Sequence, residues 1–268
     1  MLQRSTEQKI TFILRLACAM CFIGHGAFGI ITKPVWCNYF AVFGIGQKLA
    51  YQLMPVVGTV DILFGLLVLF YPLRGVFAWL VIWGGITALL RPLSGEPLAE
   101  FIERAGNYGA PLILLLLTSI PTRRNFFSRL PSNIPFTDES YKRVRIGLQV
   151  TAFLIFAGHG WLNLLLKKGL LAQYASLGFN DTHLVATIVG TAELAAAVFI
   201  LFRPAPQLVF LLLLWKMGTE LFYPQYGMLE WIERGGSYGV LLALWLVVRY
   251  RPAYRSSLGS RSFSQMAT

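Results

Sequence analysis

The chain has 268 residues, of which 56% are hydrophobic and 13% charged, with a formal net charge of +11 and a mean hydropathy of +0.61. Soluble domains carry about 25% charged residues, so this composition excludes an ordinary soluble globular domain and indicates a membrane protein. The basic residues gather at one set of ends of the apolar segments. This pattern favours membrane topology and contact with anionic lipids, and it argues against binding of nucleic acid.

Eight apolar segments are close to the length that an α-helix needs to cross a hydrocarbon core, roughly 20 residues. They lie near residues 11–31, 51–71, 75–93, 106–121, 145–166, 183–202, 206–224 and 235–250. The segments are continuous and lack the alternation of a membrane β-barrel, so we expect an all-α integral membrane protein with eight transmembrane helices. An even number of spans puts both termini on one face. The positive-inside rule makes that face cytoplasmic, in an inner (plasma) membrane.

The second half of the chain repeats the first. Gly24-His25-Gly26 returns as Gly158-His159-Gly160, GTVD ending at Asp61 returns as GTAE ending at Glu193, and IERAGNYG returns as IERGGSYG. Four spans per copy is an even number, so both copies insert the same way up. We therefore expect two tandem four-helix bundles related by a pseudo-twofold axis along the membrane normal. The expected divisions are a first unit at 1–121, a basic cytoplasmic linker at 122–144, a second unit at 145–250 and a basic cytoplasmic tail at 251–268.

Polar residues at matching depths predict one outward-opening polar pocket in each unit. Ionisable side chains within spanning segments are costly and usually face a bundle interior or a functional pathway. The expected lining is His25, Asp61, Thr87, Arg91 and Tyr108 in the first unit, and His159, Glu193, Thr219, Glu220 and Tyr238 in the second. No zinc-type spacing of ligands is present, so no metal site is expected.

A structural interpretation of the same residues is also open. Each histidine can bond to an acidic neighbour, while the flanking glycines allow close helix packing. Lys216 and Glu220 are one helical turn apart, which favours a compensating ion pair. The repeated Glu-Arg pairs at 103–104 and 233–234 are expected in the headgroup zone, where the last helix of each unit begins.

Three motifs of the repeated unit suggest a family. FIGHG and FAGHG place a glycine-flanked polar turn late in the first helix, and Lys33 and Lys167 follow soon after. DILFGLLVLF and ELAAAVFILF each lead from an acidic residue into a leucine-rich helix. In these features each half resembles the DoxX-like membrane proteins, here with two modules fused and with Gln149 at the place of Arg15. The resemblance implies four-helix modules and an association with quinone or redox systems.

Three classes of function remain open from the sequence. In the first, the pockets bind a lipophilic redox molecule such as a quinone, with His25 or His159 donating to a carbonyl oxygen and Asp61 or Glu193 exchanging the proton. In the second, the chain is an accessory subunit of a larger membrane protein complex. In the third it is a small proton-linked transporter, which the lack of a clear broken helix disfavours. A haem ligated by both His25 and His159 is a further, less favoured cofactor.

Overall fold

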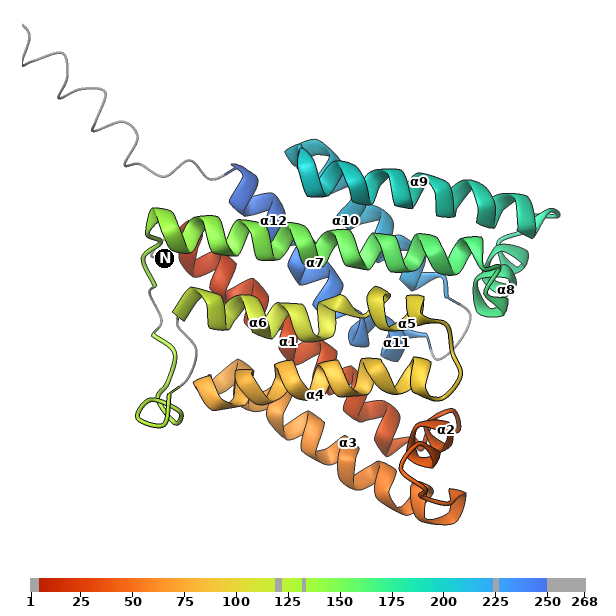
Figure 1. Cartoon of the computed structure of the whole chain (residues 1–268), viewed down its shortest axis with the longest axis horizontal. Helices are drawn as coiled ribbons and strands as arrows, with labels where there is room; N and C mark the ends of the chain where they lie inside the picture. Colours follow the sequence, from red (N-terminus) through yellow and green to blue (C-terminus); the bar gives the residue numbers. More distant parts are fainter. Residues whose placement is uncertain (1–4, 119–121, 132–133, 224–226, 250–268) are drawn as a thin grey trace, which may run out of the picture.

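The part of the chain that the structure describes is built from helices and loops. The structure is a computed structural model and describes residues 5–118, 122–131, 134–223 and 227–249. The predicted tail at 251–268 lies outside these residues. The helices are α1 (Thr6–Ile30), α2 (Trp36–Ala41), α3 (Gln47–Phe70), α4 (Arg74–Leu93), α5 (Leu98–Glu103), α6 (Ala105–Thr118), α7 (Asp138–Leu164), α8 (Lys168–Ser176), α9 (Thr182–Phe202), α10 (Pro206–Leu221), α11 (Met228–Glu233) and α12 (Gly235–Arg249). The predicted all-α class is confirmed, and both halves have the same order of long and short helices (Figure 1).

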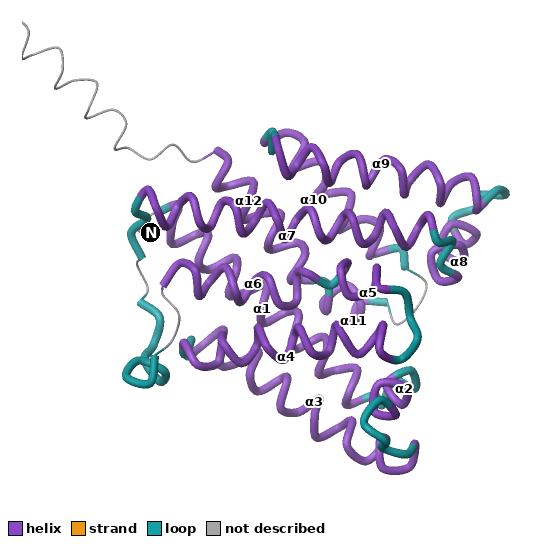
Figure 2. Tube along the Cα trace, in the orientation of Figure 1, coloured by secondary structure: helices purple, strands orange, loops and turns teal. Residues whose placement is uncertain are grey.

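Four helices, α1, α3, α4 and α9, are long and apolar enough to cross a membrane. The pair α7 and α8, bent by 82°, makes a fifth if it counts as one span. Three other predicted segments form shorter helices, α6, α10 and α12, of 14, 16 and 15 residues. α6 and α12 are short because a break at Arg104 or Arg234 separates each from a preceding helix of 6 residues. By length and composition these apolar helices support the expected membrane protein, and loops lie at both ends of the long helices (Figure 2).

Arg15 and Gln149 donate hydrogen bonds to main-chain carbonyls at the ends of α3 and α9, which hold corresponding places in the two halves. Arg15 donates from Nε to the carbonyl of Val68 at 3.1 Å and from a terminal nitrogen to that of Leu69. Gln149 donates from Nε2 to two carbonyls at the end of α9, at 3.2 and 3.0 Å. The last carbonyls of a helix have no intrahelical partner, so these side chains satisfy groups that would be costly to leave unpaired. The second unit therefore keeps the contact without the charge.

Within each half, glycines bring the first two long helices together, α1 with α3 and α7 with α9. A Cβ on Gly26 would overlap the carbonyl oxygen of Gly58 in α3, and a Cβ on Gly160 would overlap that of Gly190 in α9. Small residues at such crossings let two helix backbones approach closely. This confirms the close packing expected of the glycines that flank the two histidines.

The short helices α5 and α11 form part of the contact between the two halves, beside contacts of α1 with α12 and of α6 with α7. α5 packs against α7 of the second half, and α11 packs against α1 of the first. A Cβ on Gly24 would overlap the backbone of Glu233, and a Cβ on Gly158 would overlap the backbone of Glu103. The first glycine of each Gly-His-Gly segment therefore contacts the other half, and the second contacts its own half.

The outer faces of α3 and α9 carry large exposed apolar side chains. Phe70 and Phe202 are 69% and 76% exposed, and Leu63, Phe199 and Ile188 are also exposed. Contiguous apolar surface on helices of this length is typical of contact with lipid.

Candidate functional site

Each half holds a triad of an imidazole and an indole on a buried carboxylate. In the first half, His25 Nδ1 lies 2.7 Å from Asp61 Oδ2, and Trp83 Nε1 donates to Asp61 Oδ1 at 2.7 Å. The helices α1, α3 and α4 supply one member each. Asp61 is 1% exposed, so its two oxygens are satisfied inside the protein. The predicted pairing of a histidine with an acidic neighbour is thereby confirmed in this half.

The second half repeats this arrangement with glutamate in place of aspartate. His159 Nδ1 lies 2.6 Å from Glu193 Oε2, and Trp215 Nε1 donates to Glu193 Oε1 at 2.8 Å. Asn163, held by the hydroxyl of Tyr174 at 2.6 Å, also lies near the imidazole. The second imidazole therefore has one more polar side-chain neighbour, Asn163, than the first.

The hydrogen bond to the carboxylate decides which atom of His25 is available to a ligand. An ionised carboxylate only accepts hydrogen bonds, so Nδ1 of the imidazole donates to Asp61. In a neutral imidazole the other nitrogen, Nε2, is then an acceptor, and in the protonated form it is a donor. His25 can therefore accept a hydrogen bond from a hydroxyl group or, when charged, donate one to a carbonyl oxygen.

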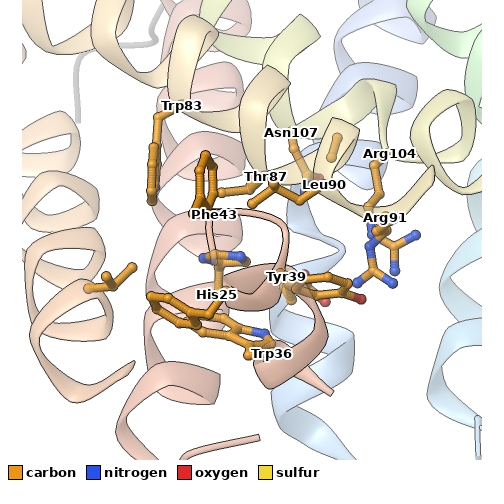
Figure 3. A pocket seen from close by; sticks show the side chains of 14 residues that line it. His25, Trp36, Tyr39, Phe43, Trp83, Thr87, Leu90, Arg91, Arg104 and Asn107 are labelled. Atoms are coloured by element: carbon orange, nitrogen blue, oxygen red, sulfur yellow. The ribbon is translucent and has the colours of Figure 1, made fainter. Parts of the chain in front are cut away.

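An aromatic pocket of about 80 Å³ lies at His25. Its apolar lining is Trp36, Tyr39, Phe40, Phe43, Val57, Trp83, Ala88 and Leu90. The rings of His25 and Trp36 have centroids 4.7 Å apart at an interplanar angle of 32°. Figure 3 shows Trp36 and the imidazole next to each other at one side of the pocket, with Trp83 and Phe43 on another. Water needs roughly 10–15 Å³ of such space per molecule, so the pocket has room for a small group or several waters.

Charged and polar side chains close the other side of this pocket. They are Thr87, Arg91, Arg104, Asn107 and Glu233. Arg91 pairs with Glu96 at 3.3 Å, and Glu96 also accepts from the hydroxyl of Tyr39 at 2.7 Å. Figure 3 shows the two guanidinium groups beside Tyr39. One pocket thus combines an apolar wall with a polar edge, which is common in sites for small molecules.

A larger cavity of about 390 Å³ lies at His159 and extends between the halves. Its charged lining is Lys33, Arg91, Arg104, Lys167, Arg234, Glu96, Glu103, Glu220 and Glu230. Substitutions within the repeat make it different from the aromatic pocket. Glu220 stands where the first half has Ala88, and Leu170 follows His159 as Trp36 follows His25. The two imidazoles thus line different cavities, which does not favour one haem ligated by both.

Reciprocal ion pairs connect the two halves. Lys33 pairs with Glu230 at 3.1 Å, and Lys167 pairs with Glu100. The two lysines hold matching places in the repeat, as do the two glutamates. Burial opposes ionisation of Glu100, but Arg104, Lys167 and Arg91 outweigh it and lower its pKa to about 2.

Glu103 is the centre of a second group of ion pairs. It lies 2.7 Å from Arg234, 3.1 Å from Lys216 and 3.1 Å from Arg104. Burial opposes its ionisation, but these three cations outweigh it and hold its pKa well below the ordinary value. Lys216 also pairs with Glu220 at 2.5 Å, which confirms the predicted compensating pair.

The Glu-Arg repeats, expected in the headgroup zone, are buried against the other half of the chain. Glu103, Arg104 and Glu233 are 2%, 5% and 4% exposed, because α5 and α11 pack on the first helix of the other half. Burial opposes ionisation of Glu233, but Arg234, Arg104 and Lys33 outweigh it and lower its pKa to about 2.

The structure brings most of the predicted first-unit residues together. His25, Thr87 and Arg91 line the aromatic pocket, and Asp61 lies behind His25. Tyr108 is not part of the lining. Its hydroxyl donates to a main-chain carbonyl in α5 at 3.4 Å.

The second-unit residues divide in the same way. His159 and Glu220 line the large cavity, and Glu193 lies behind His159. Thr219 does not line it and donates to a carbonyl of its own helix at 3.1 Å. Tyr238 also lies outside the lining, and its buried hydroxyl has no hydrogen-bond partner among the described residues.

Several site residues were absent from the sequence-based set. Trp83 and Trp215 complete the triads, and their repetition at matching places was the available signal. Trp36, Tyr39 and Phe43 come from α2 and the turn after it, where no repeated motif marked them.

Comparison with protein-family models, curated proteins and solved structures finds no match to this chain.

Proposed function

We propose that the pocket at His25 binds a flat, lipophilic ring compound of the quinone class in a redox-linked membrane system. The observation that carries this proposal is the imidazole in tilted contact with Trp36 and with Nδ1 bound to Asp61, which leaves Nε2 for a ligand. A ring carbonyl accepts from the charged imidazole, and a ring hydroxyl donates to the neutral one. Stacking on aromatic side chains adds affinity for a flat ring.

The proposal fits the resemblance to DoxX-like proteins, which implies an association with quinone or redox systems. The aromatic pocket supports a ring ligand, since Tyr39, Phe40 and Phe43 surround the space beside His25. The polar edge at Arg91 and Arg104 provides donors for a second oxygen of the ring.

In the proposed architecture, two four-helix modules stand side by side, related by a pseudo-twofold axis along the membrane normal, with both termini cytoplasmic. Eight crossings result if α5 with α6, and α11 with α12, each make one broken span. Reciprocal contacts support the axis, because Gly24 meets Glu233 while Gly158 meets Glu103. Gly106 and Gly236, at matching places, also contact each other's backbone region.

A transport function gains support from one observation. The helix breaks at Arg104 and Arg234 lie beside a charged cavity between the halves. Discontinuous helices of this kind form the substrate sites of many secondary transporters. Uptake of a substrate into proteoliposomes, driven by a pH gradient, would favour this alternative over simple binding.

The test of the quinone proposal is titration of the purified protein with decylubiquinone by isothermal calorimetry. His25→Gln and Trp36→Leu should each weaken binding by about tenfold, because each removes one contact to the ring. The matched control is His159→Gln, which changes the same triad in the other half and should leave this affinity unchanged. Absence of saturable binding, or equal loss in all three variants, would overturn the proposal.

A further inference from the structure

A loop rich in arginine and phenylalanine lies against the turn between α3 and α4. It comprises residues 122–130 and is called the arginine loop below. The amide of Gly75, at the start of α4, donates to the carbonyl of Phe126 at 2.8 Å. The amide of Leu130 donates to the carbonyl of Pro72, also at 2.8 Å. These main-chain bonds fix the loop at the end of the molecule where α4 and α7 begin (Figure 1).

The two phenylalanines of the arginine loop have different surroundings. A Cβ on Gly75 would overlap the ring of Phe126, so this ring lies directly on the start of α4. The ring of Phe127 meets that of Phe126 edge to face, with centroids 5.1 Å apart, but it is 80% exposed. The loop therefore uses one ring to attach to the helix and presents the other to its surroundings.

Three arginines of the loop are exposed and have no acidic partner. They are Arg123, Arg124 and Arg129, and none of them pairs with a carboxylate among the described residues. Residues 104–137 contain no Asp or Glu, nor do residues 62–95, which include the turn on which the loop lies. The segments that build this surface therefore carry positive charge without compensating carboxylates.

An exposed aromatic ring among arginines suits the surface of a membrane. α3 ends at Phe70 and α4 begins at Arg74, and both are long, apolar helices. The turn between them therefore lies where a spanning helix leaves the hydrocarbon core. Phenylalanine can insert its ring at the boundary of headgroups and acyl chains, while basic residues beside it attract anionic lipids. Guanidinium groups also form paired hydrogen bonds with phosphate oxygens.

We infer that the arginine loop binds anionic phospholipids of the membrane in which the helices lie. Phe127 enters the interfacial layer. Arg123, Arg124 and Arg129 bind phosphate oxygens of the headgroups. Each basic residue near an anionic membrane surface adds to the attraction, and the attachment of the loop to α4 gathers the three at one place. The inference does not depend on the ligand of the His25 pocket.

The start of α7 supplies a matched control. Lys142 and Arg143 are exposed there, at the same end of the molecule (Figure 1). Two acidic residues lie in the first turn of α7, and one of them, Glu139, is 4.0 Å from Arg143. The loop double variant is Arg123→Gln with Arg124→Gln, and the α7 double variant is Lys142→Gln with Arg143→Gln. Both remove the same charge at the same end, but only the first changes the arginine loop.

Lipid binding can be measured by native mass spectrometry of the full chain in detergent, titrated with phosphatidylglycerol or with phosphatidylcholine. Wild type and the α7 double variant should both bind phosphatidylglycerol more tightly than phosphatidylcholine. The loop double variant should lose about tenfold or more of its affinity for phosphatidylglycerol, because each arginine contributes to the attraction. Phe127→Ser should also weaken this binding, although it leaves the charge unchanged.

Thermal unfolding of the same proteins checks that these exposed substitutions leave the fold intact. Equal loss of phosphatidylglycerol affinity in the two double variants would overturn the inference, because the charge of this whole end, and not the arginine loop, would then attract the lipid. A wild-type protein without preference for phosphatidylglycerol would overturn it as well.

Discussion

Gly158 of α7 lies so close to Glu103 of α5 that a Cβ at position 158 would overlap main-chain atoms. Because backbone cannot move aside as a flexible side chain does, Gly158→Ala should force α5 away from α7. We expect a loss of about 1–3 kcal/mol in the free energy of unfolding, the usual cost of overpacking. Unfolding of the purified protein by added denaturant would measure the loss.

Gly85 provides the control for this change. It lies in α4, and a Cβ there would meet no atom within 4 Å. Gly85→Ala should be neutral or stabilising by about 0.5–1 kcal/mol, since alanine favours helix more than glycine does. If Gly158→Ala proved as stable as Gly85→Ala, the close packing of the two halves would be contradicted.

The repeat in the sequence predicted the histidine–carboxylate pairs but not the contacts between halves. Conserved spacing within one chain put His25 with Asp61 and His159 with Glu193, because both pairs lie on neighbouring spans. Whether α5 packs on its own half or on the other depends on tertiary contacts that leave no periodic signal. Glu103 therefore looked like a headgroup residue, although it is the centre of a buried ion-pair group.

The sequence repeat likewise did not predict the aromatic residues that line the pocket. Trp36 and Phe43 lie on a short helix and in the turn after it, and neither sits within a spanning segment. Aromatic residues there are equally suited to the membrane interface, so composition alone does not separate the two roles. The fold of α2 back over His25 decides between them.

The second prediction concerns the bonds from Arg15 to the end of α3. Arg15→Gln should be nearly neutral, because Gln149 makes the equivalent bonds to α9 in the second half. Arg15→Leu should cost about 1–3 kcal/mol, since it leaves the carbonyls of Val68 and Leu69 without this donor. Unfolding curves of the two variants in one detergent would compare them, and a Gln variant as unstable as the Leu variant would refute the equivalence.

Acid should destabilise the contact between the halves. Glu100 and Glu233 each have a pKa of about 2, below the ordinary value of 4.5. A carboxyl whose folded-state pKa is depressed contributes stability that is complete above its unfolded pKa and is lost as the pH falls towards its folded pKa. The thermal midpoint should therefore drop progressively as the pH falls from about 5 to 2.

A pair of variants isolates this acid effect. Glu233→Gln removes one of the depressed groups, so its midpoint should depend less on pH over the same range. Glu139 is an exposed residue, its side chain 82% accessible, and Glu139→Gln should keep the full wild-type dependence. A wild-type slope in Glu233→Gln would show that other carboxyl groups dominate the acid response.

Ala88 is one of the residues by which the aromatic pocket differs from the cavity of the second half. Its side chain is 1% exposed and lines the pocket at the place where the second half carries Glu220. Ala88→Leu should fill part of the cavity of about 80 Å³ with apolar atoms. Binding of decylubiquinone should then weaken by about tenfold or more, whereas added apolar contacts should keep the protein folded. Calorimetric titration beside thermal unfolding separates the two effects, and undiminished affinity in a folded Ala88→Leu variant would place the ring compound elsewhere.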